Sequence, residues 1–146
     1  MKHSCLYLFL LIIVPLLSSC KPGNVPDVPS VKWSLSDNIN PLISMTLTTG
    51  YPADFESSAS KEDKVAIFRD SICVGEASPE ETSLGTRFFV LIYGAESNEE
   101  LSRELIIRFY SKKHQRIFHA SESIIFASDT QVGTVSDPKL FTWVQD

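Results

Sequence analysis

Apolar positions in this chain recur with the two-residue period of β-strands, and no window sustains the 3.6-residue period of a helix. Residues 43–49 alternate most clearly, with Ile43, Met45 and Leu47 facing one way and hydroxyl side chains facing the other. This alternation predicts a strand with one buried face. The sequence Gly-Tyr-Pro at residues 50–52 is expected to end it.

Further short runs predict the other strands, because they are rich in β-branched and aromatic residues and are bounded by Gly, Pro, Asp and Ser. Residues 65–68 and 72–74 flank an Arg-Asp-Ser sequence, which predicts a tight hairpin. Residues 87–93 are apolar on both faces, which predicts an interior place in a sheet. The remaining predicted strands are residues 104–110, 116–119, 123–127 and 140–144, and the predicted loops are residues 54–63, 79–85, 94–100 (with a short helical piece at 98–101) and 111–115.

The spacing of these runs predicts the fold class. Short strands with turn signals every 8–12 residues are typical of an all-β protein, and we expect an antiparallel Ig-like β-sandwich of about seven to eight strands. A small barrel is the alternative. Residues 33–146 form the whole domain in this prediction, and a domain of that size buries enough apolar area to stand without disulfides.

The start of the chain has the pattern of a bacterial lipoprotein leader. A weakly basic start precedes an apolar run at residues 6–17, which is too short to span a bilayer as a mature helix of about 20 apolar residues. The sequence Leu-Ser-Ser-Cys at residues 17–20 then resembles a lipobox, which predicts cleavage between Ser19 and Cys20 and lipidation of the Cys20 thiol. An ordinary signal peptide cut near Ser19 and an uncleaved N-terminal helix are the alternatives.

A tether is expected to join this anchor to the domain. Residues 21–30 hold three prolines, which are incompatible with regular helix or sheet and predict an extended segment. The chain therefore divides into a leader (1–19), a lipidated Pro-rich tether (20–32) and a β-sandwich domain (33–146). Lysine rather than aspartate at position 21 favours the bacterial outer membrane, and the sequence leaves open whether the domain faces the periplasm or the cell surface.

Charge and cysteine content narrow the possible partners. The chain has 13 Lys and Arg residues against 18 Asp and Glu residues, a formal net charge of -5, which argues against binding to nucleic acid. Cys73 is the one cysteine outside the leader and the lipobox, so no disulfide is expected within the domain. Its apolar neighbours predict a buried, inert thiol.

Several of these segments together resemble a β-rich module of secreted and surface proteins of Bacteroidota. The resemblance covers most of residues 42–144 and implies a fold but no reaction, ligand or cofactor. Cys73 matches the module's Cys, whereas Val74 stands where the module has Arg and Asp70 where it has Gly, so no contact through that Arg is carried over. The matching segments are residues 45–48, 64–68, 70–75, 88–94, 106–110 and 132–134, with residues 129–138 as the module's final crossover loop.

The sequence contains no nucleophile elbow, zinc-helix, P-loop or dinucleotide-binding motif, so we expect neither an enzyme nor a cofactor. His114 and His119 fall on one predicted hairpin, and two exposed histidines fall short of the three or four ligands of a metal site. The acids of residues 54–63 lack the spacing and central Gly of a calcium loop, which favours a solvated loop.

Aromatic side chains are the better candidates for function. Alternation places Phe89, Leu91 and Tyr93 on one face of their strand, and Phe88, Val90 and Ile92 on the other. We predict a binding surface for a protein partner or a polysaccharide, built from Tyr93, Arg108, Tyr110 and Trp143. The alternative is that loops and the tether cover these residues.

The sequence thus predicts a membrane-anchored lipoprotein whose β-sandwich is a non-catalytic binding or assembly module on the bacterial outer membrane. A periplasm-facing structural accessory of an outer-membrane complex is one alternative, and a small hydrolase is another.

Overall fold

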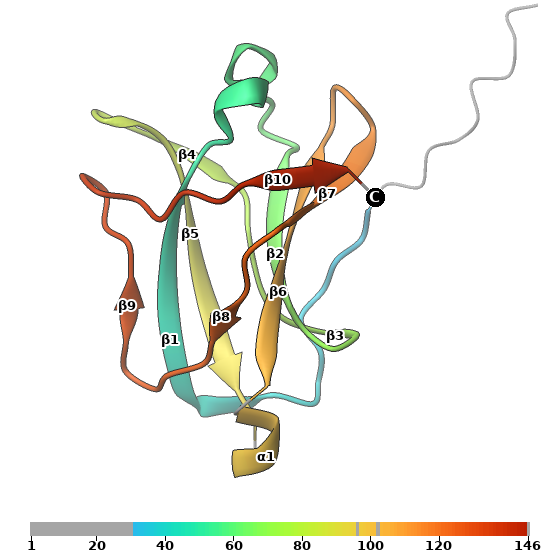
Figure 1. Cartoon of the computed structure of the whole chain (residues 1–146), viewed down its shortest axis with the longest axis vertical. Helices are drawn as coiled ribbons and strands as arrows, with labels where there is room; N and C mark the ends of the chain where they lie inside the picture. The colour runs from blue at the N-terminus through green and yellow to red at the C-terminus, as the bar shows by residue number, and fades with distance from the viewer. Residues whose placement is uncertain (1–30, 96, 102, 146) are drawn as a thin grey trace, which may run out of the picture.

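The computed structural model describes residues 31–95, 97–101 and 103–145, and their strands form two sheets packed face to face (Figure 1). The predicted leader, the lipidation site Cys20 and most of the tether lie outside the described residues. The elements in chain order are β1 (Asn40–Gly50), the 3-10 helix η1 (Ala53–Ser58), β2 (Lys64–Arg69), β3 (Ile72–Ala77), β4 (Pro79–Thr82), β5 (Gly85–Gly94), α1 (Asn98–Leu101), β6 (Glu104–Ser111), β7 (Arg116–Ala120), β8 (Ile124–Ile125), β9 (Gln131–Val132) and β10 (Trp143–Gln145).

The two sheets confirm the predicted all-β sandwich. The four-stranded sheet has the order β4-β5-β1-β9, and the six-stranded sheet has the order β10-β7-β6-β2-β3 with β8 paired to β6. Neighbouring strands are antiparallel except β1 and β9, which are parallel. No helix in the described part of the chain has the length and apolarity to cross a membrane.

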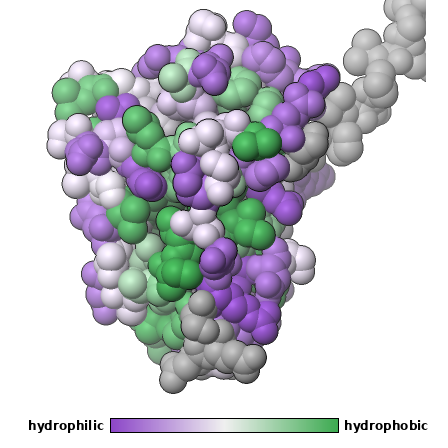
Figure 2. All heavy atoms as spheres, viewed as in Figure 1, coloured by the Kyte–Doolittle hydropathy of each residue, from purple (hydrophilic) through white to green (hydrophobic). Residues whose placement is uncertain are grey.

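The core lies between the sheets and follows the strand alternation. Phe88, Val90 and Ile92 point inward from β5, and Leu105, Ile107 and Phe109 point inward from β6; each is at most 1% exposed. Aromatic rings join the two sheets at one end of the core, where Phe88 of β5 meets Phe109 of β6 edge-on with ring centroids 6.1 Å apart. Apolar side chains also reach the surface near β8. Figure 2 shows hydrophobic surface over the middle of the view, where Figure 1 places β8, and Ile125 of β8 is 53% exposed.

The chain changes sheets between β3 and β4, and Gly75 makes this corner possible. A Cβ atom on Gly75 would lie 2.6 Å from the Leu91 carbonyl oxygen and 3.0 Å from a Val90 methyl, so only glycine lets β3 approach β5 this closely. The pairing of β2 with β3 shifts register beside Gly75, where Val74 has no partner on β2. Val74 lies in the main core, and Cys73 lies on the outer side of the sheet. Cys73 is buried, as predicted.

Two predicted loops contain strands, and this raises the strand number to ten in the described part of the chain. Residues 79–85 were expected to be a loop, but Pro79–Thr82 is β4 and pairs with β5. An edge strand forms hydrogen bonds on one side only, so it tolerates Pro79 and Glu80. These two residues are uncommon in strands, and for that reason the sequence predicts a loop here. The crossover loop at residues 129–138 likewise contains β9, which adds two residues beside β1.

The expectation of a fully solvated loop at residues 54–63 is wrong for its last residue. Asp63 is 0% exposed, and its carboxylate accepts hydrogen bonds from the Tyr51 hydroxyl, from the Ser60 amide at 2.7 Å and from the Lys112 amide at 2.6 Å. These donors come from three different parts of the chain. Asp63 therefore ties the end of β1, the η1 loop and the β6–β7 turn together.

Candidate interaction surface

The outer face of the four-stranded sheet presents apolar side chains to solvent. Since Phe88, Val90 and Ile92 fill the core, alternation forces Phe89 and Leu91 of β5 outward, where they are 37% and 42% exposed. On β1 the residues opposite them are Thr48 and Thr46. The next outward pair along the strands is Tyr93 with Ser44, so this face carries hydroxyl and apolar side chains in alternating columns.

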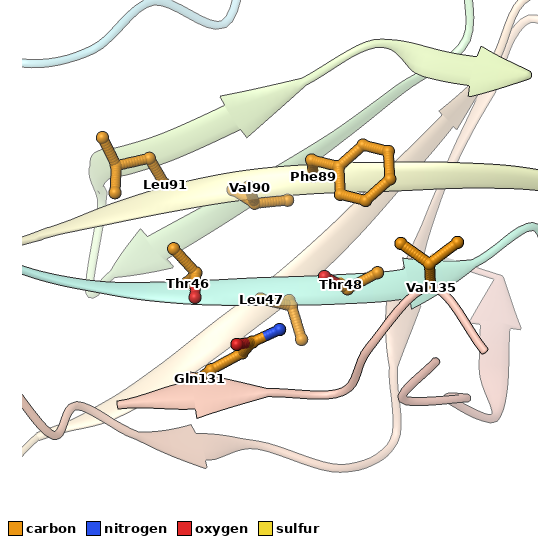
Figure 3. Close-up of a pocket in the computed structure, with 8 residues that line it drawn as sticks. All are labelled: Thr46, Leu47, Thr48, Phe89, Val90, Leu91, Gln131 and Val135. Carbon is orange, nitrogen blue, oxygen red and sulfur yellow. The ribbon is translucent and has the colours of Figure 1, made fainter. Parts of the chain in front are cut away.

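A hollow of about 390 Å³ lies on this face over β1 (Figure 3). Phe89 and Leu91 project from β5 along one side of it, and Gln131 of β9 and Val135 of the following loop border the other side. The side chains of Thr46 and Thr48 stand between these two borders. The full lining consists of Thr46, Leu47, Thr48, Phe89, Val90, Leu91, Gln131 and Val135.

The hollow is uncharged. None of its eight lining residues has an ionisable side chain, and most of the surface it offers is hydrocarbon. A partner without charge loses little solvation here, whereas a charged group would be desolvated against apolar walls without a counter-charge. The polar groups available for orienting a ligand are the Thr46 hydroxyl and the Gln131 amide.

Arg87 holds the Val135 side of the hollow in place. Its guanidinium donates to three backbone carbonyl oxygens: Leu84 at 2.6 Å, Thr86 at 2.9 Å and Val135 at 3.0 Å. The loop also crosses close to β1 at Gly133, which has φ +72° and where a Cβ would lie 2.3 Å from the Thr48 carbonyl oxygen. The wall of the hollow therefore depends on a side chain in β5 and a glycine in the loop.

The four residues predicted as a binding surface do not share one face. Tyr93 lies on the outer face of the four-stranded sheet, beside Leu91, and its carbonyl accepts a hydrogen bond from buried Arg69 at 3.0 Å. Arg108 and Tyr110 lie on the outer face of the six-stranded sheet, where Arg108 stacks over the Phe68 ring at 4.7 Å. Trp143 packs against the core instead, with its ring centroid 5.5 Å from that of Phe109.

Tyr110 is also not available to a partner in this conformation. It is 6% exposed, and the Trp33 ring lies across it with centroids 6.5 Å apart. The covering residue, Trp33, belongs to the predicted domain of residues 33–146 and not to the predicted tether. Of the four predicted residues, Tyr93 is the one that lies beside the hollow.

His114 is exposed in the β6–β7 turn, and His119 is half-buried in β7. The His114 ring packs edge-on against Phe55 at 5.3 Å, and its Nδ1 lies 3.3 Å from the hydroxyl of Ser111, which is fully buried and closed to a substrate. His119 pairs with Arg108 across β6 and β7. Among the described residues, no three His, Cys, Asp or Glu side chains are grouped to hold a metal ion.

A second, larger hollow of about 570 Å³ lies between the residues after η1 and strand β4. Its ionisable lining residues are Lys61, Glu80 and Glu81, and the Glu81 carboxylate accepts a hydrogen bond from the Thr86 hydroxyl at 3.1 Å. This hollow therefore combines apolar surface with charged side chains. It differs from the hollow over β1 by these charges, because none of the residues that line the hollow over β1 is ionisable.

Some residues of the site escaped the sequence analysis. The alternation in residues 87–93 placed Phe89 and Leu91 on the face opposite Phe88 and Val90. Nothing in the sequence showed which of these two faces is buried in the core and which faces solvent. Gln131 and Val135 lie in a segment whose sequence has no strand pattern, so the pairing of Gln131 with β1 and the bond of Val135 to Arg87 depend on long-range packing.

Comparisons of the chain with models of known protein families, with curated protein sequences and with solved structures found no match. The resemblance to a Bacteroidota module therefore stays a prediction. Function is therefore inferred from the geometry and chemistry of the site itself.

Proposed function

We propose that this chain is a lipid-anchored, non-catalytic binding or assembly module of the bacterial outer membrane. The anchor is Cys20, behind the predicted leader of residues 1–19, and the Pro-rich tether carries the sandwich. The docking surface is the outer face of the four-stranded sheet. One observation carries this proposal: an uncharged, mainly apolar hollow bordered by Phe89, Leu91 and Val135.

The partner that fits this surface best is a protein with a short, uncharged apolar segment. Exposed apolar side chains that border a hollow are typical of protein docking sites, and the energy of such contacts concentrates in a few central aromatic and aliphatic residues. A polysaccharide would need many hydrogen-bonding groups to replace its bound water, and the lining provides mainly two, on Thr46 and Gln131.

A pair of matched substitutions tests the docking surface. Leu91 and Val144 have almost the same exposure, 42% and 43%, but Leu91 lies on the proposed surface and Val144 lies in β10 of the other sheet. After mild cross-linking of intact cells, we expect Leu91→Asp to abolish recovery of a stoichiometric partner and Val144→Asp to leave it unchanged. Equal recovery with both variants would exclude this face as the docking site.

Protease treatment of the same cells tests where the module faces. Digestion of the domain together with known surface proteins supports exposure to the outside. Protection of the domain while those proteins are digested supports the periplasm-facing structural role instead.

A protease-resistant adduct in the cross-linking experiment would identify the partner as a glycan rather than a protein.

A further inference from the structure

The residues just before β1 lie against the outer face of the six-stranded sheet. We call residues 31–36 the strap; in Figure 1 the blue part of the chain runs beside this sheet before it turns into β1. The Trp33 ring makes edge contacts with Phe68 at 5.8 Å and with Tyr110 at 6.5 Å between centroids. It covers a small apolar cluster of Ala66, Phe68 and Cys73, which is separate from the main core.

The strap is attached at few points. Its backbone bonds to the sheet through the Ser36 amide, which donates to the Cys73 carbonyl at 3.1 Å. Lys32, Ser34 and Leu35 are exposed, so Trp33 provides most of the apolar contact. Because the strap precedes β1, its displacement breaks no strand pairing in either sheet.

The surface under the strap continues into surface that is already exposed. Phe68, Cys73 and Tyr110 are each 6% exposed with the strap in place, and Ile106, which pairs with Phe68 across β2 and β6, is 39% exposed. Removal of the Trp33 ring therefore joins the covered cluster to Ile106 through Phe68, with the Arg108 guanidinium at the border of this mainly apolar area. Contiguous apolar areas of this kind mark interaction sites when they are exposed.

We propose that the strap is a releasable cover, which opens as a local unit while the sandwich stays folded and so uncovers a second apolar surface on the six-stranded sheet. In the closed state Trp33 occupies that surface. Segments held by few contacts open at a free energy well below that of global unfolding. Anything that binds or pulls the chain N-terminal to the strap acts on Trp33 before it acts on β1.

The Cys73 thiol reports on the position of the strap. In the full-length protein, alkylation by iodoacetamide is followed by mass spectrometry of the tryptic peptide of residues 70–87, which contains Cys73 but neither Cys5 nor Cys20. We expect Trp33→Ala to speed alkylation of Cys73 by roughly tenfold or more, equivalent to about 1.4 kcal/mol. Trp33→Phe should have an intermediate effect, and Leu35→Ala, in the exposed part of the strap, should have none.

The dependence of alkylation on urea separates local opening from unfolding of the whole domain. Local opening exposes little surface, so the alkylation rate should be nearly independent of urea well below the unfolding transition. Equal rates in the wild-type protein and Trp33→Ala would overturn the proposal. So would rates that rise steeply from the lowest urea concentrations in both proteins, because alkylation would then report only global unfolding.

Discussion

The Tyr51 hydroxyl donates a hydrogen bond to the fully buried carboxylate of Asp63. Burial, followed by the hydrogen bond and the charge of Asp63, raises the pKa of the Tyr51 hydroxyl above its ordinary value of 10.0. Tyr51 also stacks on Phe88 and meets Phe109 edge-on, with centroids 5.6 and 5.7 Å apart. One side chain thus joins a polar anchor to the aromatic part of the core.

Tyr51→Phe keeps the ring and removes the donor to the Asp63 carboxylate. A hydrogen bond to a charged group contributes about 1.5–3 kcal/mol, so we expect the free energy of unfolding at pH 7 to fall by roughly that amount. Urea unfolding followed by tryptophan fluorescence measures the change. A loss near zero would show that water or another donor replaces the hydroxyl.

The same variant should alter the response to alkaline pH. A raised pKa means that the folded protein keeps the Tyr51 proton at a pH where the unfolded chain releases it, so this contribution is complete below pH 10.0 and is lost as the pH rises further. Wild-type stability should therefore fall above pH 10.0 with an added slope of up to about 1.4 kcal/mol per pH unit. Parallel losses in the wild type and Tyr51→Phe would contradict the assignment.

Phe88 and Phe89 are neighbours in sequence with opposite environments, since Phe88 is 0% exposed and Phe89 is 37% exposed. We expect Phe88→Ala to cost about 3–5 kcal/mol because it leaves a cavity in the core. Phe89→Ala should cost about 1 kcal/mol or less, as is usual for surface positions. Chemical denaturation of the two variants measures both values, and similar losses would mean that the outer face of β5 is not a free surface.

Arg87 should control the order of the loop that borders the hollow. In Arg87→Ala the three carbonyl oxygens lose their donor, so we expect faster hydrogen exchange at residues 134–137 and a loss of about 1 kcal/mol in stability. Arg87→Lys should not restore protection, because a single ammonium cannot reproduce the planar fork of donors. Unchanged exchange in Arg87→Ala would show that Gly133 and β9 alone position the loop.

The lipid anchor has a direct chemical test. In cells fed with a clickable palmitate analogue, we expect Cys20→Ala to lose all labelling, since the proposed lipobox makes Cys20 the acceptor of the acyl chains. Cys73→Ala is the matched control, because that thiol is buried in the domain and should not affect labelling. Persistent labelling of Cys20→Ala would show that the Leu-Ser-Ser-Cys sequence is not a lipobox.

Local signals explain which parts of the fold the sequence predicts. Alternation predicted β1, runs of apolar and β-branched residues predicted β5 and β6, and Asp70 marked the β2–β3 hairpin, where it takes the left-handed conformation at φ 53° that Asp tolerates. The short helix at Asn98–Leu101 also lies where acidic helix-forming residues predict it. These elements carry their own patterns, so no knowledge of packing was needed.

The remaining features depend on contacts between distant parts of the chain. Strand β4 has polar side chains and exists because the turn before Gly85, at φ +101°, folds it back onto β5. Burial of Asp63 requires donors from Tyr51 and Lys112, which are far from it in sequence. The four predicted surface residues lie on different faces for the same reason. Alternation assigns a side chain to one face of its strand, but it does not show which sheet the strand joins or which segment covers that face.

The docking surface itself is tested most directly by a photo-cross-linking amino acid placed at position 91, or at position 144 as a control of equal exposure, in intact cells. The proposed function predicts one discrete adduct from position 91, lost on addition of the Phe89→Ala substitution, and no such adduct from position 144. Adducts of the same size and yield from both positions, or none from position 91, would contradict it.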